Sequence, residues 1–163
     1  MKRRPSFSSK LRDTLIIGAP KAKLAGTLGA SAVALAGHIE DSDAISPLNS
    51  ISHIVWGDEA YKQRDLSLKY TGTALLLNDV SIAGWAYLHE WMFAKARREG
   101  RGKVCALGAI AVSILAYVVD YHCVPERFKP GFERHLQPKS LVLIYLILAL
   151  SLMASDLVIG RKN

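Results

Sequence analysis

Four polar residues interrupt the apolar stretch 70–94 at a spacing that could support proton transfer or ion binding. Asn78 and His89 are eleven residues apart, and so are Asp79 and Glu90. Eleven residues make close to three turns of an α-helix, so the members of each pair lie on one stripe, about 16 Å apart along the axis. Acidic and histidine side chains in such series are typical of the proton relays of transporters.

Five more polar residues are expected at the two ends of the same group of helices. Asp156 follows the apolar run 141–155 and should lie at the same depth as His89 and Glu90, near the cytoplasmic end. The opposite end is expected to hold the other four, which are Asn49, His53, Asp120 and His122. The chain therefore predicts one polar cluster at each membrane face, with Asp79 between them.

Three interpretations of these polar residues are compatible with the sequence. They could form a proton or ion pathway, they could bind a metal ion, or they could be hydrogen bonds that hold helices together, each worth about 1 kcal/mol in lipid. The chain has five histidines but no HxxxH, HxxEH or HExxH motif. The pattern favours the structural interpretation, then the pathway, and metal binding last. Because the chain has no GxSxG motif and no phosphate-binding glycine loop, neither nucleophilic catalysis nor a cofactor is expected.

The elements that must position these residues are membrane helices. Residues 104–119 and 141–155 contain no charged side chain, and with their flanks both reach the ~20 apolar residues that a helix needs to cross a bilayer. The stretches 70–94 and 18–37 are less apolar but long enough. The sequence therefore predicts an all-α integral membrane protein. It is a bundle of four transmembrane helices in a single domain, residues 18–160, with spans near 18–37, 70–94, 104–122 and 140–160.

Basic residues divide unequally between the two ends of this bundle. Fourteen of the 21 lysines and arginines lie before residue 24, in the connection 95–103 or after residue 160, and seven lie in the other connections. The positive-inside rule makes the richer end cytoplasmic, so the basic segment 1–17 and the tail 161–163 are both expected inside the cell. Lys21 and Lys23 are then expected to reach back to the lipid headgroups. The net charge of +7 indicates attraction to anionic lipids rather than to nucleic acid.

Residues 1–36 could alternatively be a cleaved signal peptide. Basic residues precede a moderately apolar stretch that ends in the small residues Ala34-Leu35-Ala36, as at a cleavage site. Cleavage would leave three transmembrane helices and an N-terminus outside. The stretch is unusually rich in glycine and alanine, and small residues four apart, such as Ala25 and Gly29, allow close helix packing in membranes. The composition therefore favours a first transmembrane helix.

The connection 38–69 is expected to contain a short helix at the outer membrane surface. Ser46 is a typical N-cap, Pro47 suits the first helical turn, and Gly57 is a typical end. A helix over 47–56 would place Trp56 at headgroup depth and project Asn49 and His53 together. An amphipathic lid whose polar groups bond to other backbone is favoured over a pore helix or a substrate-capturing one.

Asp79 should sit near the middle of the bilayer, where an unpaired carboxylate is too costly to persist. We therefore expect its side chain to face the other helices and to contact a polar partner. The candidate partners on those helices are Thr27, Ser31, Ser113, Tyr117 and Ser151.

Several motifs carry a resemblance to a known group of proteins. They are Pro47-Leu48-Asn49-x-Ile51-Ser52-His53-x-x-Trp56-Gly57, Asn78-Asp79 with Glu90, and Asp120-Tyr121-His122-x-Val124-Pro125 with Pro130-Gly131-Phe132-Glu133. Through them, residues 20–160 resemble small inner-membrane proteins of proteobacteria that are described as uncharacterised. The helix pattern is also similar to that of YagU-like inner-membrane proteins, which are linked to acid tolerance. The resemblance implies a four-helix protein of the bacterial inner membrane, and it brings no activity, cofactor or catalytic residue.

The sequence thus favours a non-enzymatic component of the bacterial inner membrane, in contact with lipid and able to associate with further copies or with another membrane protein. The first alternative is a small transport or proton-handling protein that uses Asp79, His89, Glu90 and Asp156. The second is a metal-dependent membrane enzyme with its site at the outer face.

Overall fold

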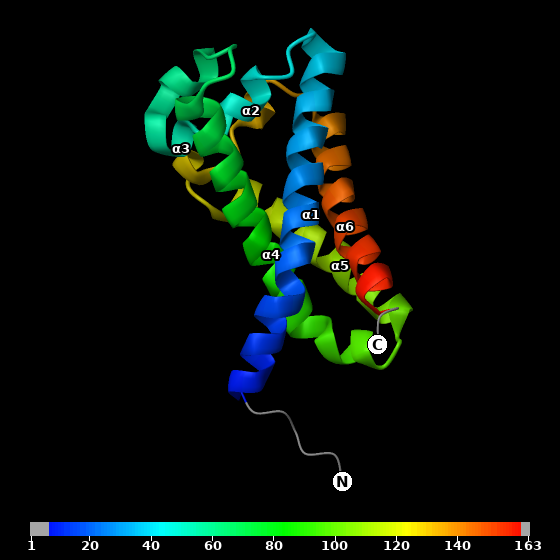
Figure 1. The fold of residues 1–163 in the computed structure, drawn as a ribbon. Coiled ribbons are helices and arrows are strands. Elements are labelled where there is room, and N and C mark those ends of the chain that lie inside the picture. Colours follow the sequence, from blue (N-terminus) through cyan, green and yellow to red (C-terminus); the bar gives the residue numbers. More distant parts are fainter. Residues whose placement is uncertain (1–6, 161–163) are drawn as a thin grey trace.

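The computed structural model describes residues 7–160, and every regular element in that range is helical. Four long helices run alternately up and down the molecule: α1 (Phe7–Asp41), α4 (Thr73–Arg98), α5 (Gly102–Val118) and α6 (Pro138–Gly160) (Figure 1). The predicted all-α class is therefore confirmed. The first part of the predicted basic segment, residues 1–6, and the predicted tail, residues 161–163, lie outside the described residues.

Two of the helical segments are long and apolar enough to cross a membrane, and these are Gly102–Cys123 and Pro138–Asp156. They coincide with the two charge-free runs of the sequence. Helix α1 contains the predicted span 18–37, and the predicted span 70–94 starts in the turn before α4 and continues in α4. Helix α1 already begins at Phe7, so it includes residues 7–17, which were predicted to precede the bundle. The Phe7 ring packs edge-on against the Trp91 ring of α4, with 5.7 Å between their centroids.

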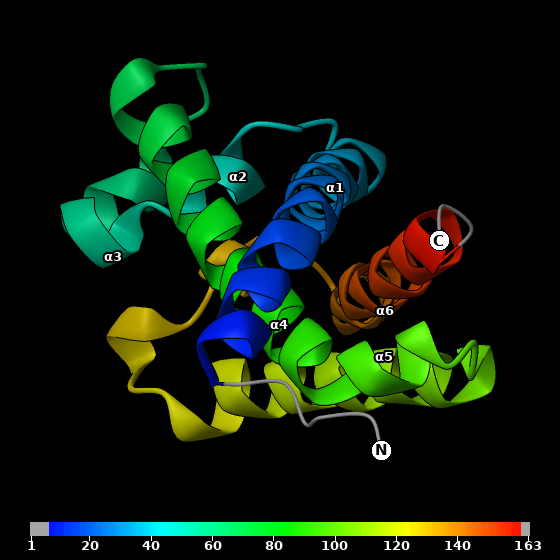
Figure 2. The same ribbon diagram turned by 60° about the horizontal axis from the view of Figure 1, so that its bottom comes forward.

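The long helices pack through small side chains. Helix α1 lies against α4 and α6, whereas α5 lies against α6 and α4. Figure 2 shows α5 crossing one side of the bundle, oblique to α1 and α6. Ala25, Ala86, Ala109 and Ala116 are completely buried at these contacts, together with the larger Leu152. Small residues allow helix backbones to approach closely, which is the packing that the glycine and alanine content of the sequence predicted.

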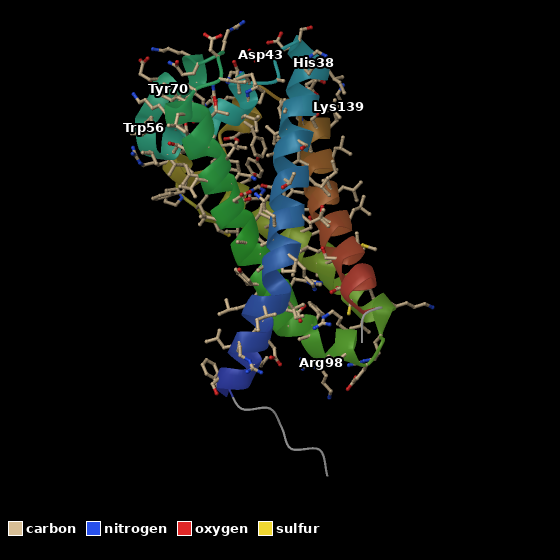
Figure 3. The ribbon with its side chains drawn as sticks, viewed as in Figure 1. His38, Asp43, Trp56, Tyr70, Arg98 and Lys139 are labelled. Carbon is tan, nitrogen blue, oxygen red and sulfur yellow. The ribbon has the colours of Figure 1, made fainter. Side chains whose placement is uncertain are left out.

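The two ends of the bundle differ in construction. We call the end formed by the start of α1, the α4–α5 turn and the end of α6 the basic end, and the end formed by the connections 42–72 and 124–137 the loop end. Figure 3 shows Arg98 at the basic end and His38, Asp43 and Lys139 at the loop end. The loop end is built from short helices and turns, whereas the basic end has a single tight turn at residues 99–101.

The predicted outer helix 47–56 is present in two pieces, α2 (Ser46–Ser50) and α3 (His53–Trp56), which are separated by a turn at residues 51–52. The predicted N-cap is wrong: the Asp43 carboxylate accepts hydrogen bonds from the backbone N–H groups of Ile45 and Ser46, at 3.0 and 2.9 Å. Asp43 offers a charged acceptor to these N–H groups, so Ser46 is already helical. Gly57 ends α3 with φ +69°, as predicted.

The remaining elements are single turns that connect these helices. A 3₁₀ helix, Gly57–Lys62, follows α3, and a π-helical turn, Leu68–Gly72, leads into α4. A second π-helical turn, Val119–Cys123, extends α5 toward the loop end. Two short 3₁₀ helices, Glu126–Phe128 and Phe132–Arg134, then lead to α6.

Candidate functional site

Five ionisable side chains form a buried charge network near the basic end, and they are Lys21, His89, Glu90, Arg97 and Asp156. The ammonium group of Lys21 has no exposed surface and lies between two carboxylates. Its Nζ is 2.7 Å from Glu90 Oε2 and also forms an ion pair with Asp156 Oδ1. Arg97 Nη2 donates to Glu90 Oε1 at 2.9 Å. With both acids ionised and both bases protonated, two positive charges balance two negative ones.

His89 lies beside this network without being fully bonded to it. Its Nε2 is 3.2 Å from the carbonyl oxygen of Cys105, which requires Nε2 to carry the proton, and it is 3.9 Å from Asp156 Oδ2. Neither His89 Nδ1 nor Asp156 Oδ2 has a hydrogen-bond partner among the described residues. The network therefore retains two buried acceptor atoms without a described donor.

The sequence anticipated three of the five residues of the buried charge network. His89, Glu90 and Asp156 were expected at one depth, and the fold brings them together. Lys21 was expected at the lipid headgroups and instead is fully buried, which corrects that prediction. Two carboxylates on α4 and α6 converge on its position and offer a stronger partner than lipid would. One signal in the sequence could have identified the buried position of Lys21. Its predicted depth matches that of the acids Glu90 and Asp156 on two other predicted helices.

Asp79 lies on α4 against α1, but it is not the buried carboxylate that the sequence suggested. Its side chain is 42 % exposed, and its Oδ2 lies 3.5 Å from the Nζ of Lys23, which is itself 76 % exposed. None of the five predicted hydroxyl partners bonds to it in the described structure. Its neighbour Asn78 is buried and donates its Nδ2 to the carbonyl oxygen of Gly26 at 3.1 Å. Asp79 thus belongs to a surface ion pair, and Asn78 fastens α4 to α1.

Asn49 and His53 were expected to project together, and the structure gives them separate bonding partners. Asn49 is completely buried and donates its Nδ2 to the carbonyl oxygens of Gln63 and Asp65, while its Oδ1 accepts from the Thr71 hydroxyl at 2.7 Å. His53 Nδ1 bonds to the carbonyl oxygen of Ser50 at 2.8 Å. Both side chains therefore bond to backbone at the loop end. The lid interpretation expects such bonds from the polar groups of this segment.

A cavity of about 660 Å³, which we call the outer cavity, opens near the loop end. Its walls come from all four long helices, from α3, and from the turn at 51–52, the turn Val119–Cys123 and the connection 124–137. Val80 and Phe128 line it and are 63 % and 55 % exposed, so the cavity communicates with the surroundings of the protein. Most of its other walls are apolar, including Val33, Ile54, Leu77, Leu88, Val119, Phe132, Ile144 and Leu148.

Few polar groups line the outer cavity, and Asp120 is the only charged residue among them in the described structure. The Tyr145 hydroxyl donates to Asp120 Oδ2 at 2.6 Å. Within the part of the chain that the structure describes, Asp120 makes no ion pair. The fold does not join it to His53, and His122 instead lies edge-on to the Tyr117 ring, 6.0 Å between centroids. The predicted outer polar cluster is thus divided into separate contacts.

Neither a metal centre nor a relative assigns a role to these residues. Among residues 7–160, no group of three or more histidine, cysteine, aspartate or glutamate side chains could hold a metal ion. Comparisons of the chain with protein-family models, with curated proteins and with solved structures give no match. The function is therefore inferred from the geometry of the buried charge network and the outer cavity.

Proposed function

We propose that this chain is an integral protein of the bacterial inner membrane in which all four long helices cross the bilayer, with the basic end in the cytoplasm. The length and apolar composition of α5 and α6 support two of the four proposed spans. In α1 and α4 the charges that would oppose insertion are largely paired: Lys21 with Glu90 and Asp156, and Lys23 with Asp79. Pairing lowers the cost of charged groups in lipid, which is otherwise at least about 2.5 kcal/mol each.

The orientation follows from the surface charge of the basic end. Lys95, Arg98, Arg101 and Lys103 all lie in or beside the short α4–α5 turn, where they would contact anionic headgroups. A reporter inserted at Gly100 and one fused after Asn163 should both report a cytoplasmic position. A periplasmic signal at Gly100 would contradict the proposed orientation.

Within the membrane, we propose that the protein acts without catalysis and binds an apolar molecule from the lipid phase in the outer cavity. The observation that carries this proposal is the cavity itself. Its volume lies in the range of about 300–1,000 Å³ that small-molecule sites occupy, and its walls are apolar with a few polar groups. The opening at Val80 and Phe128 would face the outer half of the bilayer, so that a ligand could enter from the side.

Labelling with a diazirine-bearing alkyl chain in liposomes would test binding in the outer cavity. Gly84 lines the cavity, and a Cβ atom built there meets no atom within 4 Å, so the position is open. Gly84→Leu should therefore fill the space without a clash and reduce labelling of residues 119–124 by at least fivefold. Gly84→Ala is the matched control and should leave labelling close to that of the natural protein.

The exposed face of α6 supplies an internal standard for the same experiment. Val142 and Leu146 are 66 % and 50 % exposed and do not line the cavity. Their labelling should be equal in all variants, because they would contact bulk lipid. Equal labelling of residues 119–124 in the Gly84→Leu and Gly84→Ala proteins would show that the cavity holds no apolar ligand.

A second candidate function is proton handling by the buried charge network. The unbonded His89 Nδ1 and Asp156 Oδ2 favour it, since both can accept a proton. The balanced pairing of Lys21 and Arg97 with the two acids favours a structural role more strongly. Proton flux into proteoliposomes that is lost in Asp156→Asn but kept in Asp79→Asn would support the proton-handling function.

A further inference from the structure

We propose that the ligand of the outer cavity is an organic cation with an apolar body, and that its positive charge is recognised by Asp120. This inference rests on the proposed function and names the chemical class of ligand for the same site. Its starting point is the contrast between Asp120 and the two carboxylates of the buried charge network. Glu90 and Asp156 each have a cationic partner, whereas Asp120 receives only the neutral hydroxyl of Tyr145.

Asp120 is half-buried in an apolar cavity, so its carboxylate loses part of its hydration and has no cation to compensate for that loss. Tyr145 bonds to Oδ2, and no described residue donates to Oδ1. The cavity therefore holds an acceptor whose best partner is a positively charged group. A ligand that brings such a group would form an ion pair in a low-dielectric setting, where the attraction is stronger than in water.

The other polar lining of the outer cavity also selects for a cation. The Nδ2 of Asn78 is already bonded to Gly26, so its Oδ1 remains as a second acceptor with no donor among the described residues. The rings of Trp85 and Tyr145 line the same cavity. The faces of aromatic rings attract cations, and tryptophan does so most strongly. An anionic headgroup, such as the carboxylate of a fatty acid, could accept from Ser81 or Trp85, which also line the cavity, but it would be repelled by the negative charge of Asp120.

Two ions of the same shape and opposite charge provide the test. Tetraphenylphosphonium and tetraphenylborate would each be titrated into the full-length protein in a non-ionic detergent, with binding measured by equilibrium dialysis. The natural protein should bind the phosphonium at least tenfold more tightly than the borate. Asp120→Asn keeps the acceptor for Tyr145 but removes the charge, so it should weaken phosphonium binding at least tenfold. Gly84→Leu should abolish it by filling the space.

Equal affinity for the two ions, or an Asp120→Asn protein that binds the phosphonium as tightly as the natural one, would overturn the assignment of a cationic ligand. The comparison of the two ions on the natural protein needs no variant, so it holds even if Asp120→Asn folds poorly. Absence of binding by the phosphonium would also overturn the assignment. If Gly84→Leu still reduces alkyl labelling in that case, the outer cavity binds an apolar ligand of another class. If Gly84→Leu does not reduce labelling, the proposed function is wrong as well.

Discussion

The two ends of this molecule solve the problem of polar groups in an apolar bundle in opposite ways. At the basic end, the buried charge network pairs each of its four charged side chains with an opposite charge, and the only open positions are one nitrogen of His89 and one oxygen of Asp156. At the loop end, hydrogen bonds such as those of Asn49 hold the connections in place, and the outer cavity keeps Asp120 without a cation. The comparison suggests that the first cluster fastens helices and that the second is prepared for a ligand.

The largest effect is expected from removing the cation at the centre of the buried charge network. Lys21→Met should destabilise the protein by about 3–5 kcal/mol, because it leaves Asp156 without its charge partner and Glu90 with Arg97 alone. The measurement is reversible unfolding in mixed micelles. Lys23→Met is the matched control and should cost less than about 1 kcal/mol, since its pair with Asp79 is exposed.

A double substitution sharpens this prediction. Lys21→Met combined with Asp156→Leu removes one charge of each sign and leaves the pair between Glu90 and Arg97 intact. The double variant should therefore be more stable than Lys21→Met alone. If it is less stable, the network is held together by something other than charge balance, and the contrast between the two ends would be lost.

The next effect concerns the fastening of the loop end. Gly131 has φ +92°, and a Cβ atom there would lie 2.6 Å from the backbone oxygen of Ser50 and 2.8 Å from Nδ1 of His53. Gly131→Ala should cost about 2–3 kcal/mol and should also weaken ligand binding, because Pro130 and Phe132 line the outer cavity. Gly57→Ala also changes a glycine with positive φ, here +69° with ψ −160°, but open space surrounds it. Because only glycine adopts this backbone region readily, the variant should cost about 1–3 kcal/mol, but it should leave binding unchanged.

Glu40 provides a smaller, pH-dependent contribution at the loop end. Its carboxylate accepts from the Ser140 hydroxyl at 2.6 Å and from the Gln137 N–H at 2.8 Å, at the start of α6. These bonds, that of Ser140 first, lower the pKa of Glu40 below its ordinary value. A lowered carboxyl pKa stabilises the fold above the unfolded pKa of about 4.3, and this stabilisation is lost as the pH falls through the folded pKa.

Glu40→Gln should therefore cost less than about 1 kcal/mol at pH 7, because solvent screens this partly exposed carboxylate, and progressively less as the solution is acidified below pH ~4. The measurement is the unfolding midpoint across that pH range. Glu126→Gln changes an exposed carboxylate at the same end, and it should leave the dependence of the unfolding midpoint on pH unaltered. If Glu40→Gln does not change the dependence of the unfolding midpoint on pH, the Glu40 carboxylate does not fasten α1 to α6.

The smallest effect on stability is expected at Asp120, and it contrasts most directly with Lys21. Asp120→Asn keeps an acceptor for Tyr145 and removes an unpaired charge, so the free energy of unfolding should change by less than about 0.5 kcal/mol or should rise. A loss comparable to that of Lys21→Met would show that Asp120 has a structural role. The outer cavity would then no longer differ in kind from the buried charge network.

The sequence by itself determined the helices and the depth of several polar residues. Charge-free runs longer than a soluble strand or turn can form only buried or membrane helices, and residues 104–119 and 141–155 indeed lie in α5 and α6. The fixed rise per residue of an α-helix predicted that Glu90 and Asp156 lie at the same depth, because the depth of a residue depends only on its distance in sequence from the end of its helix. Turn chemistry similarly located the end of α3 at Gly57, where only a residue without a side chain adopts φ +69° readily.

Only the tertiary structure decided which side chains meet. The rotation of each helix about its axis depends on packing against its neighbours, and no pattern within one helix reports it. That rotation turned Lys21 inward to Glu90 and Asp156, turned Asp79 outward to Lys23, and left Asp120 facing a cavity without a cation. The cavity itself arises from the oblique course of α5 and the path of the connection 124–137, which are properties of the assembled helices and not of any one segment.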